Sequence, residues 1–411
     1  MVARSESSSL QVDRPTVALV AAVGVVLFVG AWAILHGAHY DDVVITDVGV
    51  YQEYGERMAD GEVPYRDFDL EYPPAALPVF LLPALGPADD YEALFQTLML
   101  LCGCALVALV AVALARAGAT TVELGAGVAL TVLAPLLLGQ VILTRFDLWP
   151  AALVTGALAS LVAGRPRLGL GVLGAAVAAK FYALVLLPLA VLYVWRHRGR
   201  REALVSLGIF GAVLAAIVGP FLLLAPDGVV DSVTRQTGRP LQVESLGSAL
   251  LLAADRTGLY AATVVSSHGS QNLAGELPDD LANAETVLLV AAIGFVWFLF
   301  ARSSRSPERL LAASAAVVVA FVAFGKVLSP QFLIWLIPLV PLVRGRAGVG
   351  PALLLALALV FTQLWFPSRY WDVVAVGPPV WFVLVRDLLL VALFVVLLPL
   401  TGRAREARGS P

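Results

Sequence analysis

The sequence predicts an all-α polytopic membrane protein with about 12 transmembrane helices. Of its 411 residues, 60% are hydrophobic and 14% are charged, whereas soluble globular domains carry about 25% charged residues. A water-soluble fold of this size cannot bury so many apolar residues. Part of the protein surface must therefore face the lipid bilayer. No long polar stretch indicates a separate soluble domain, and no nucleic-acid partner is expected.

The first apolar run, residues 16–36, follows a polar tail of residues 1–15. The run is longer than a signal-peptide core and no small-residue cleavage site follows, so it is interpreted as a retained anchor. Eleven further helices are predicted at residues 91–115, 121–141, 147–164, 168–179, 181–196, 202–224, 284–301, 308–325, 328–343, 349–366 and 376–399. Several are shorter than a full span. The pair 168–179 and 181–196 fits either two tilted helices or a re-entrant hairpin.

Basic residues predict the orientation. With an even number of crossings, the arginine-rich ends and turns all fall on one side, which the positive-inside rule assigns to the cytoplasm. They include Arg14, Arg116, the run Trp195 to Arg201 and the closing tail 401–411. We therefore expect one transmembrane domain over residues 16–400, with both termini cytoplasmic. The outer face holds two long loops, residues 37–90 and 225–283.

The first outer loop contains a stretch, Thr46 to Pro74, that is rich in Asp, Glu and Tyr. Thr46 is a plausible N-cap of a short helix that begins at Asp47 and ends at Gly61. Asp47, Tyr51 and Tyr54 then share one helix face. A carboxylate beside aromatic rings can orient a sugar and take a proton from its hydroxyl. The alternative is that Asp47 only caps the helix.

The next segment, from Tyr72-Pro73-Pro74 onward, is apolar but too short to span. We expect it to lie in the membrane interface beside the second spanning helix. Upstream, Asp41 and Asp42 are interpreted as a solvated acidic turn rather than ligands of a divalent ion.

Lys180 and Lys326 are the two lysines of the chain, and both are predicted on the outer face. A cation placed against the positive-inside rule is often retained for an anionic partner, here a phosphate or a carboxylate, although a snorkelling lysine is the simpler reading. Cys102 and Cys104 stand two residues apart on one helix, so neither a disulfide nor a metal pair is expected. No Asp, Glu or His set has metal-ligand spacing, so no metal is predicted.

Several motifs resemble the GT-C superfamily of polyprenol-phosphate-dependent glycosyltransferases. They are Asp47-x-x-x-Tyr51, Gly61-x-x-Pro-Tyr65, Glu71-Tyr-Pro-Pro74, Leu138-Gly-Gln140, Lys180 before Phe-Tyr, and Lys326 to Pro338, which includes Gln331 and Trp335. The combination is most similar to family 87, the actinobacterial α-1,2-mannosyltransferase group that includes enzymes extending phosphatidylinositol mannosides. The resemblance covers about residues 16–370 and implies a GT-C-like bundle.

The resemblance implies that Asp47 is the general base and that the donor is a polyprenyl-phosphate sugar, attacked with inversion by a hydroxyl of a glycolipid or glycan. Such a donor needs no nucleotide site and no cofactor, and the sequence has no P-loop or Gly-x-Gly-x-x-Gly motif. Cations must face the phosphate. The predicted substrate-binding residues are Tyr51, Tyr54, Tyr65, Glu71, Tyr72, Arg145, Lys180, Arg239, Gln242, Glu244, His268, Lys326 and Gln331.

Some of these residues have simpler explanations. Arg239, Gln242 and Glu244 either contact a headgroup or only fold the second loop. His268 could bind substrate, but an exposed loop histidine is more often inert. Two other functions also stay open. A transporter or flippase of lipid-linked sugars normally shows internal repeats and polar residues near the membrane midplane, and neither is evident here. An envelope polymer ligase would share the donor and differ in its acceptor.

Overall fold

A computed structural model describes residues 12–37 and 45–402. Asp41, Asp42 and most of the two predicted tails lie outside these residues. Among the described residues, seven helices are long and apolar enough to cross a membrane. They are α1 (Arg14–Gly37), α4 (Tyr91–Arg116), α5 (Thr121–Leu138), α10 (Arg200–Leu224), α13 (Glu276–Ala301), α16 (Arg346–Gln363) and α18 (Val380–Thr401).

Shorter helices complete the bundle. They are α7 (Leu148–Val162), α8 (Pro166–Ala179), η3 (Phe181–Leu186) with α9 (Leu187–Arg198), α14 (Pro307–Ala323), and η4 (Pro330–Phe332) with α15 (Leu333–Leu339) and η5 (Val340–Leu342). Each of the 12 predicted stretches therefore holds a helix or a run of short helices. How many of them cross the bilayer stays a prediction.

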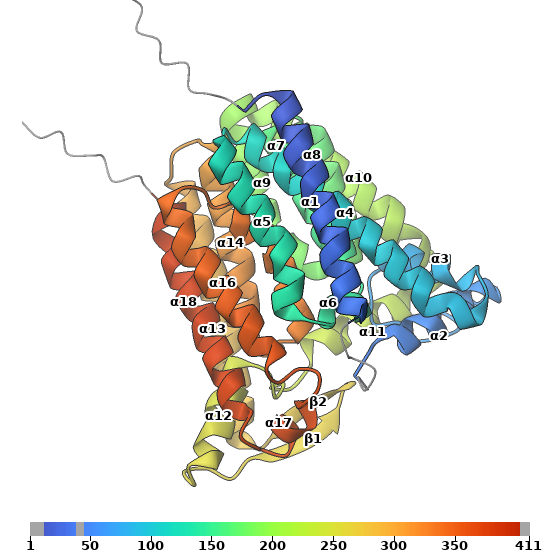
Figure 1. Ribbon diagram of the computed structural model, residues 1–411. Helices are drawn as coiled ribbons and strands as arrows, with labels where there is room; N and C mark the ends of the chain where they lie inside the picture. The colour runs from blue at the N-terminus through green and yellow to red at the C-terminus, as the bar shows by residue number, and fades with distance from the viewer. Residues whose placement is uncertain (1–11, 38–44, 403–411) are drawn as a thin grey trace, which may run out of the picture.

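The two ends of the bundle differ in character. Figure 1 shows that α1 starts and α18 finishes at one end, here called the basic end, and that the elements of both long loops gather at the opposite end, the loop end. At the basic end Arg167 pairs with Glu202, and Arg344 pairs with Glu308 and Glu123. The arginine-rich turns that predicted the orientation thus lie at one end of the bundle, and the side of the bilayer that this end faces stays a prediction.

The core lies around α14. Thirteen of its residues are buried, from Leu310 to Ala323, as expected of a helix that is apolar on all faces and surrounded by others. By contrast, only 6% of the most apolar window of α10 is buried. Leu204, Leu222, Leu223 and Leu224 of α10 are exposed. The exposed surface of α10 therefore has the composition of a lipid-facing surface.

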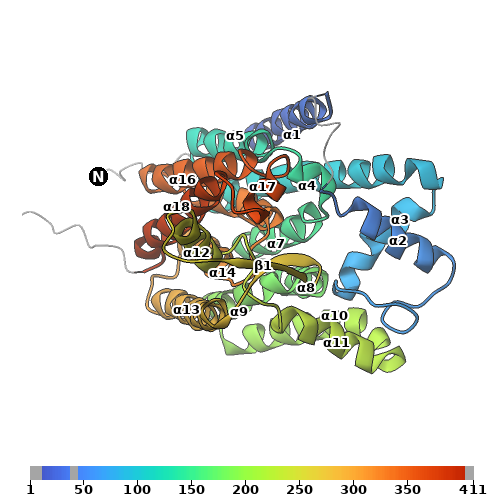
Figure 2. The ribbon, with the colours of Figure 1, turned by 90° about the horizontal axis from the view of Figure 1, so that it is seen from below.

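The first long loop forms α2 (Val48–Ala59), η1 (Pro74–Ala76), α3 (Leu77–Ala84) and η2 (Ala88–Asp90). Asp47 rather than Thr46 occupies the N-cap position of α2, while the Thr46 hydroxyl accepts the backbone N–H of Val48 at 3.1 Å. Gly61 has a φ of 91°, as the predicted helix end requires. Figure 2 shows α2 and α3 at one side of the bundle.

Helices α2 and α3 approach most closely at Gly55. A Cβ atom at this position would lie 2.3 Å from the carbonyl oxygen of Phe80 and 2.9 Å from Cβ of Ala84. Only glycine lets the two backbones come this close. The contact fixes α2, and with it Asp47, relative to α3.

The second long loop corrects the expectation of an all-α fold. Besides α11 (Pro226–Thr237) and α12 (Leu246–Arg256), it contains strands β1 (Thr263–Ser267) and β2 (Ser270–Ala274), which pair antiparallel. His268 and Gly269 form the connecting turn with φ angles of 53° and 68°, the signature of a type I′ hairpin. Short helices α6 (Val141–Thr144) and α17 (Tyr370–Val374) complete this end.

The predicted pair 168–179 and 181–196 turns back on itself. Helix α8 leaves the basic end, the chain turns at the extended residue Lys180, and η3 with α9 returns. Near the basic end, an N–H group of Arg198 donates to the carbonyl oxygen of Gly164, which lies just before α8, at 3.4 Å. Lys180 therefore stands at the tip of a helical hairpin.

Candidate functional site

Asp47 lies at the loop end, where α2 meets the segment between α6 and α7. Its Oδ2 atom is 3.2 Å from Nε of Arg145 and accepts the hydroxyl of Tyr51 at 3.3 Å. The Arg145 side chain is 5% exposed, whereas that of Asp47 is 32% exposed. Both of these contacts are made to Oδ2. The carboxylate is thus held through one oxygen and keeps exposed surface.

Aromatic rings surround Tyr51, which is fully buried. Its ring stacks on Phe80 with a centroid distance of 4.6 Å and meets Tyr72 and Phe146 edge-on at 5.8 and 5.7 Å. Each such aromatic pair contributes about 0.5–1.5 kcal/mol beyond burial. Since the Tyr51 hydroxyl reaches Asp47, this packing holds the carboxylate in place. It also accounts for the shared helix face predicted from the sequence.

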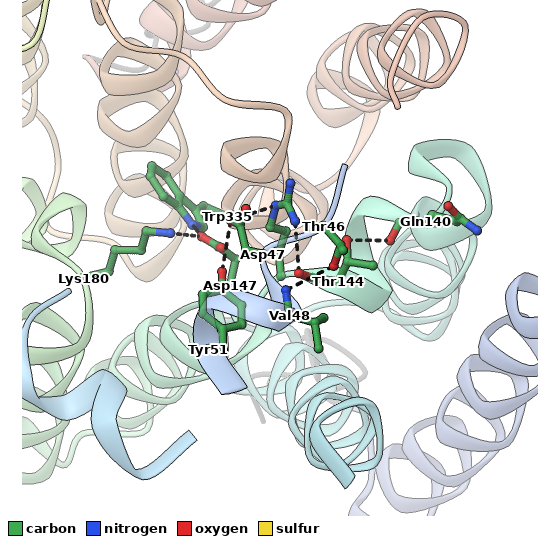
Figure 3. A network of polar contacts seen from close by, with 10 residues as sticks. Thr46, Asp47, Val48, Tyr51, Gln140, Thr144, Asp147, Lys180 and Trp335 are labelled. Atoms are coloured by element: carbon green, nitrogen blue, oxygen red, sulfur yellow. Dashed lines mark hydrogen bonds and ion pairs between the residues drawn. The ribbon is translucent and has the colours of Figure 1, made fainter. Parts of the chain in front are cut away.

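A second carboxylate, Asp147, lies at the start of α7. Its Oδ1 atom is 2.5 Å from Nζ of Lys180 and accepts the indole N–H of Trp335 at 2.5 Å. Lys180 also lies over the rings of Phe146 and Trp335, 4.5 and 5.2 Å from their centroids. The Asp147 side chain is fully buried. Figure 3 shows Asp47 and Asp147 close together, with Lys180 and Trp335 beside Asp147.

The two carboxylates differ in exposure. Asp147 neutralises Lys180 through Oδ1 and is closed to solvent, and its Oδ2 atom is buried without a hydrogen-bond partner. Asp47 sits beside an arginine and keeps exposed surface, which a group that accepts a proton from a substrate requires. The six residues Asp47, Tyr51, Arg145, Asp147, Lys180 and Trp335 are called the Asp47 cluster below. Within it, Asp47 has the accessibility of a general base.

A further polar group is buried beneath the second loop. It is called the Glu244 cluster and consists of Arg239, Gln242, Glu244, Glu285, Arg386 and Asp387. A guanidinium N–H of Arg386 donates to the carbonyl oxygen of Glu244 at 2.7 Å, and Nε of Arg386 lies 2.6 Å from Oδ1 of Asp387. The Gln242 amide contacts the Glu244 carboxyl group, and Glu285 accepts the backbone N–H of Gly247 at 2.5 Å.

Burial dominates the electrostatics of this second group. It raises the pKa of Glu244 to about 7, although Arg386 and Arg239 act in the opposite direction. Several buried polar atoms have no hydrogen-bond partner, among them Oε1 of Gln242, Oε2 of Glu285 and Oδ2 of Asp387. Buried polar atoms are normally paired with protein or ordered water, so these atoms can receive a polar ligand or water.

Lys326 connects the two clusters. Its carbonyl oxygen accepts the backbone N–H of Gln242 at 3.0 Å, and nine residues further on Trp335 contacts Asp147. The side chain of Lys326 is half-buried. Gln331 lies between the two contacts and has a buried Oε1 atom without a hydrogen-bond partner. The late motif of the sequence therefore runs from one polar cluster to the other.

The remaining predicted residues lie around these clusters. The ring of Tyr54 packs on Phe68, and burial, followed by the nearby charge of Glu71, raises its pKa to about 12. Tyr65 is buried in a separate apolar group with Phe221, and its hydroxyl donates to the carbonyl oxygen of Tyr72. The Tyr72 ring contacts Phe146 at 5.0 Å.

Two exposed residues of the prediction, His268 and Glu71, lie at or beside the hairpin turn. His268 is exposed at the tip, and a Cβ atom at its neighbour Gly269 would lie 3.8 Å from Oε1 of the exposed Glu71. The backbone conformation of His268 is sufficient reason for a polar residue here. Its role in substrate binding stays a prediction.

The sequence reasoning placed Trp335, Asp147, Glu285, Arg386 and Asp387 outside the predicted site. Arg386 and Asp387 lie inside the apolar run predicted at 376–399, and ionisable residues within a spanning segment usually mark a polar pathway or a buried pair. The sequence alone could therefore have indicated Arg386 and Asp387 as site candidates. Within the part of the chain that the structure describes, no group of three or more His, Cys, Asp or Glu residues could hold a metal ion.

The helices describe a multi-pass membrane protein, and its loop end carries two clusters of charged and polar residues. The family model described as Glycosyltransferase family 87 matches residues 70–330, more than half of the chain. The chain therefore belongs to glycosyltransferase family 87 and is a membrane glycosyltransferase, which confirms the resemblance found in its motifs.

Among solved structures, the crystal structure of ArnT from Cupriavidus metallidurans bound to undecaprenyl phosphate is similar to this chain. The two share 15% sequence identity with a TM-score of 0.47, over 93% of this chain and 76% of that one. No curated protein sequence matches the chain.

Proposed function

We propose that this enzyme moves a hexose, mannose in the simplest case, from a polyprenyl-phosphate carrier to a hydroxyl of a glycolipid or glycan on the outer face of the plasma membrane. Membership of family 87 supports the reaction class, and the arginine-rich basic end supports the orientation. The observation that carries the proposal is the difference in exposure between the two carboxylates: the Asp47 side chain is accessible and held through Oδ2 by Arg145 and Tyr51, whereas Asp147 is fully buried.

In the proposed reaction the acceptor oxygen attacks the anomeric carbon from the side opposite the phosphate. A new carbon–oxygen bond forms, the bond from the anomeric carbon to the phosphate oxygen breaks, and the configuration inverts. Asp47 takes the hydroxyl proton, and the polyprenyl phosphate leaves with the bonding electrons. Arg145 is the cation nearest to the base, and a guanidinium suits a phosphate group.

The Glu244 cluster has the composition of an acceptor site. Its unpartnered amide and carboxyl oxygens can accept hydrogen bonds from sugar hydroxyls, and Arg239 reaches the hairpin by donating to Oγ of Ser270 at 2.9 Å. Lys326 and Gln331 would lie between acceptor and donor. We assign the acceptor headgroup to this cluster and the donor to the Asp47 cluster.

The substitution Asp47→Asn tests the proposal, because the amide keeps the shape but cannot take the proton. Turnover of polyprenyl-phosphate mannose in washed membranes should fall by roughly 10²–10⁴-fold. The matched control is Asp69→Asn in the same loop, since Asp69 is 74% exposed and pairs only with Arg235 among the described residues. Normal turnover by Asp47→Asn at equal expression would exclude Asp47 as the base.

A further inference from the structure

The basic end contains an open cavity of about 470 Å³ between the end of α9 and the turn from α13 to α14. It is lined by Leu192, Trp195, Arg196, His197, Gly199 and Arg305. The cavity is at the opposite end of the bundle from the Asp47 and Glu244 clusters (Figure 1). Its volume lies in the range of ligand pockets. The proposed glycosyl transfer gives it no task.

The two arginines of this cavity have only neutral partners. Arg196 donates to the carbonyl oxygens of Phe300 and Ala301 at the end of α13, and Arg305 donates to the carbonyl oxygen of Arg196 at 3.2 Å. Among the described residues, no carboxylate forms an ion pair with either guanidinium. Two like charges therefore face one cavity without a counter-ion, an arrangement that attracts an anion.

A neighbouring cavity shows that this lack of counter-ions is specific. It has about 440 Å³ and lies on the other side of the same turn, with Arg344, Glu123 and Glu308 in its lining. Here Arg344 pairs with Glu308 at 2.6 Å and with Glu123 at 3.7 Å. The second cavity is thus internally neutralised. If the arginines only reflected the usual enrichment of basic residues at a cytoplasmic face, the two adjacent cavities would not be expected to differ in their counter-ions.

The apolar lining indicates where the anion comes from. Trp195 is 54% exposed at the end of α9, and Leu192 stands one helical turn before it. An exposed tryptophan at the end of an apolar helix is typical of the membrane–water boundary. The adjoining α10 exposes Leu204 and Val205. A lipid can therefore place its phosphate at the arginines while its chains lie along an apolar surface.

We propose that this cavity binds the phosphate of an anionic phospholipid from the leaflet at the basic end. Arg196 and Arg305 contact the phosphodiester, and Trp195 and Leu192 contact the upper part of the acyl chains. The bound lipid bridges α9 to the turn between α13 and α14. The site is separate from catalysis and neutralises two charges that the protein leaves without counter-ions.

The test is lipid binding to the full-length protein, measured by native mass spectrometry with added phosphatidylglycerol or phosphatidylcholine. Wild type should retain phosphatidylglycerol preferentially, and Arg196→Gln with Arg305→Gln should weaken this retention by roughly tenfold, since each cation near an anionic surface contributes several-fold. Arg344→Gln in the second cavity is the matched control and should retain the lipid as wild type does.

Arg196 also caps α13, so the double variant needs a folding control. The pair Arg196→Lys with Arg305→Lys should restore most of the binding, and the single variant Arg305→Gln, which alters an exposed side chain, should lose part of it. Equal retention of phosphatidylglycerol by wild type and by both glutamine variants would overturn the proposal. A second outcome would also overturn it. If inorganic phosphate raised the melting temperature as much as phosphatidylglycerol does, and only when both arginines are present, the site would hold a free anion rather than a lipid.

Discussion

The Nε atom of Arg145 lies 3.2 Å from Oδ2 of Asp47, so a nearly buried guanidinium fixes a carboxylate that remains accessible. The pair joins the first long loop to the bundle, because Asp47 precedes α2 and Arg145 precedes α7. A base positioned in this way needs little rearrangement when the acceptor arrives. The relationship also makes Arg145 a residue whose loss should affect catalysis more than folding.

Arg145→Met should lower kcat of sugar transfer by roughly 10²–10³-fold, since both the orientation of Asp47 and the proposed phosphate contact are lost. Steady-state kinetics with polyprenyl-phosphate mannose measure the change. Arg369→Gln is the control, because Arg369 lies at the same end but is 43% exposed and pairs with Asp372. If Arg145→Met raised only KM, Arg145 would bind substrate without positioning the base.

The Asp147–Lys180 pair should behave as a structural unit. Lys180→Met leaves a fully buried carboxylate without its cation, and such a loss costs about 3–5 kcal/mol. Adding Asp147→Asn should recover part of that cost, because the uncompensated charge is removed. Thermal unfolding of the two single variants and the double variant in detergent measures the coupling. A double variant as stable as wild type yet inactive would instead place Lys180 in phosphate binding.

Gly55 provides a test of how α2 positions the base. Gly55→Ala places a methyl group 2.3 Å from the Phe80 carbonyl oxygen, so α2 must move away from α3 at a cost of about 1–3 kcal/mol. Transfer should fall because Asp47 shifts with the helix. Gly49→Ala is a matched control in the same helix, since nothing lies within 4 Å of its Cβ position. Equal activity of the two variants would show that the α2–α3 contact is not needed.

Glu244 predicts a pH dependence of stability. Its pKa is raised from 4.5 to about 7 in the folded protein, so the folded state keeps a proton that the unfolded chain releases. Stability should therefore fall as the pH rises from about 4.5 to about 7 and change little above that. Glu244→Gln should remove this contribution. The melting temperatures of wild type and Glu244→Gln, measured across this pH range, test the prediction. Parallel curves of melting temperature against pH for the two proteins would contradict it.

Much of the helical framework could be predicted from the sequence. Apolar runs locate every long helix, and the spacing of Asp47 and Tyr51 predicts their contact through one turn of α2, because these signals are local. The β hairpin was missed, since its strands are short and the turn His268-Gly269 is an uncommon hairpin signal. The contact of Trp335 with Asp147 joins distant segments, and no local pattern reports it. Arg386 and Asp387 were overlooked inside an apolar run.

Helix α8 has 14 residues, so its axis rises about 21 Å, whereas the hydrocarbon layer of a bilayer is about 30 Å thick. If α8 enters the hydrocarbon layer at the basic end, Lys180 and its partner Asp147 lie below the opposite surface. In the proposed reaction the transfer then happens beneath the level of the headgroups. The carrier phosphate must then reach that depth, and a glycolipid acceptor, which is anchored in the same layer, can bring its hydroxyl there more easily than a glycan in the aqueous phase.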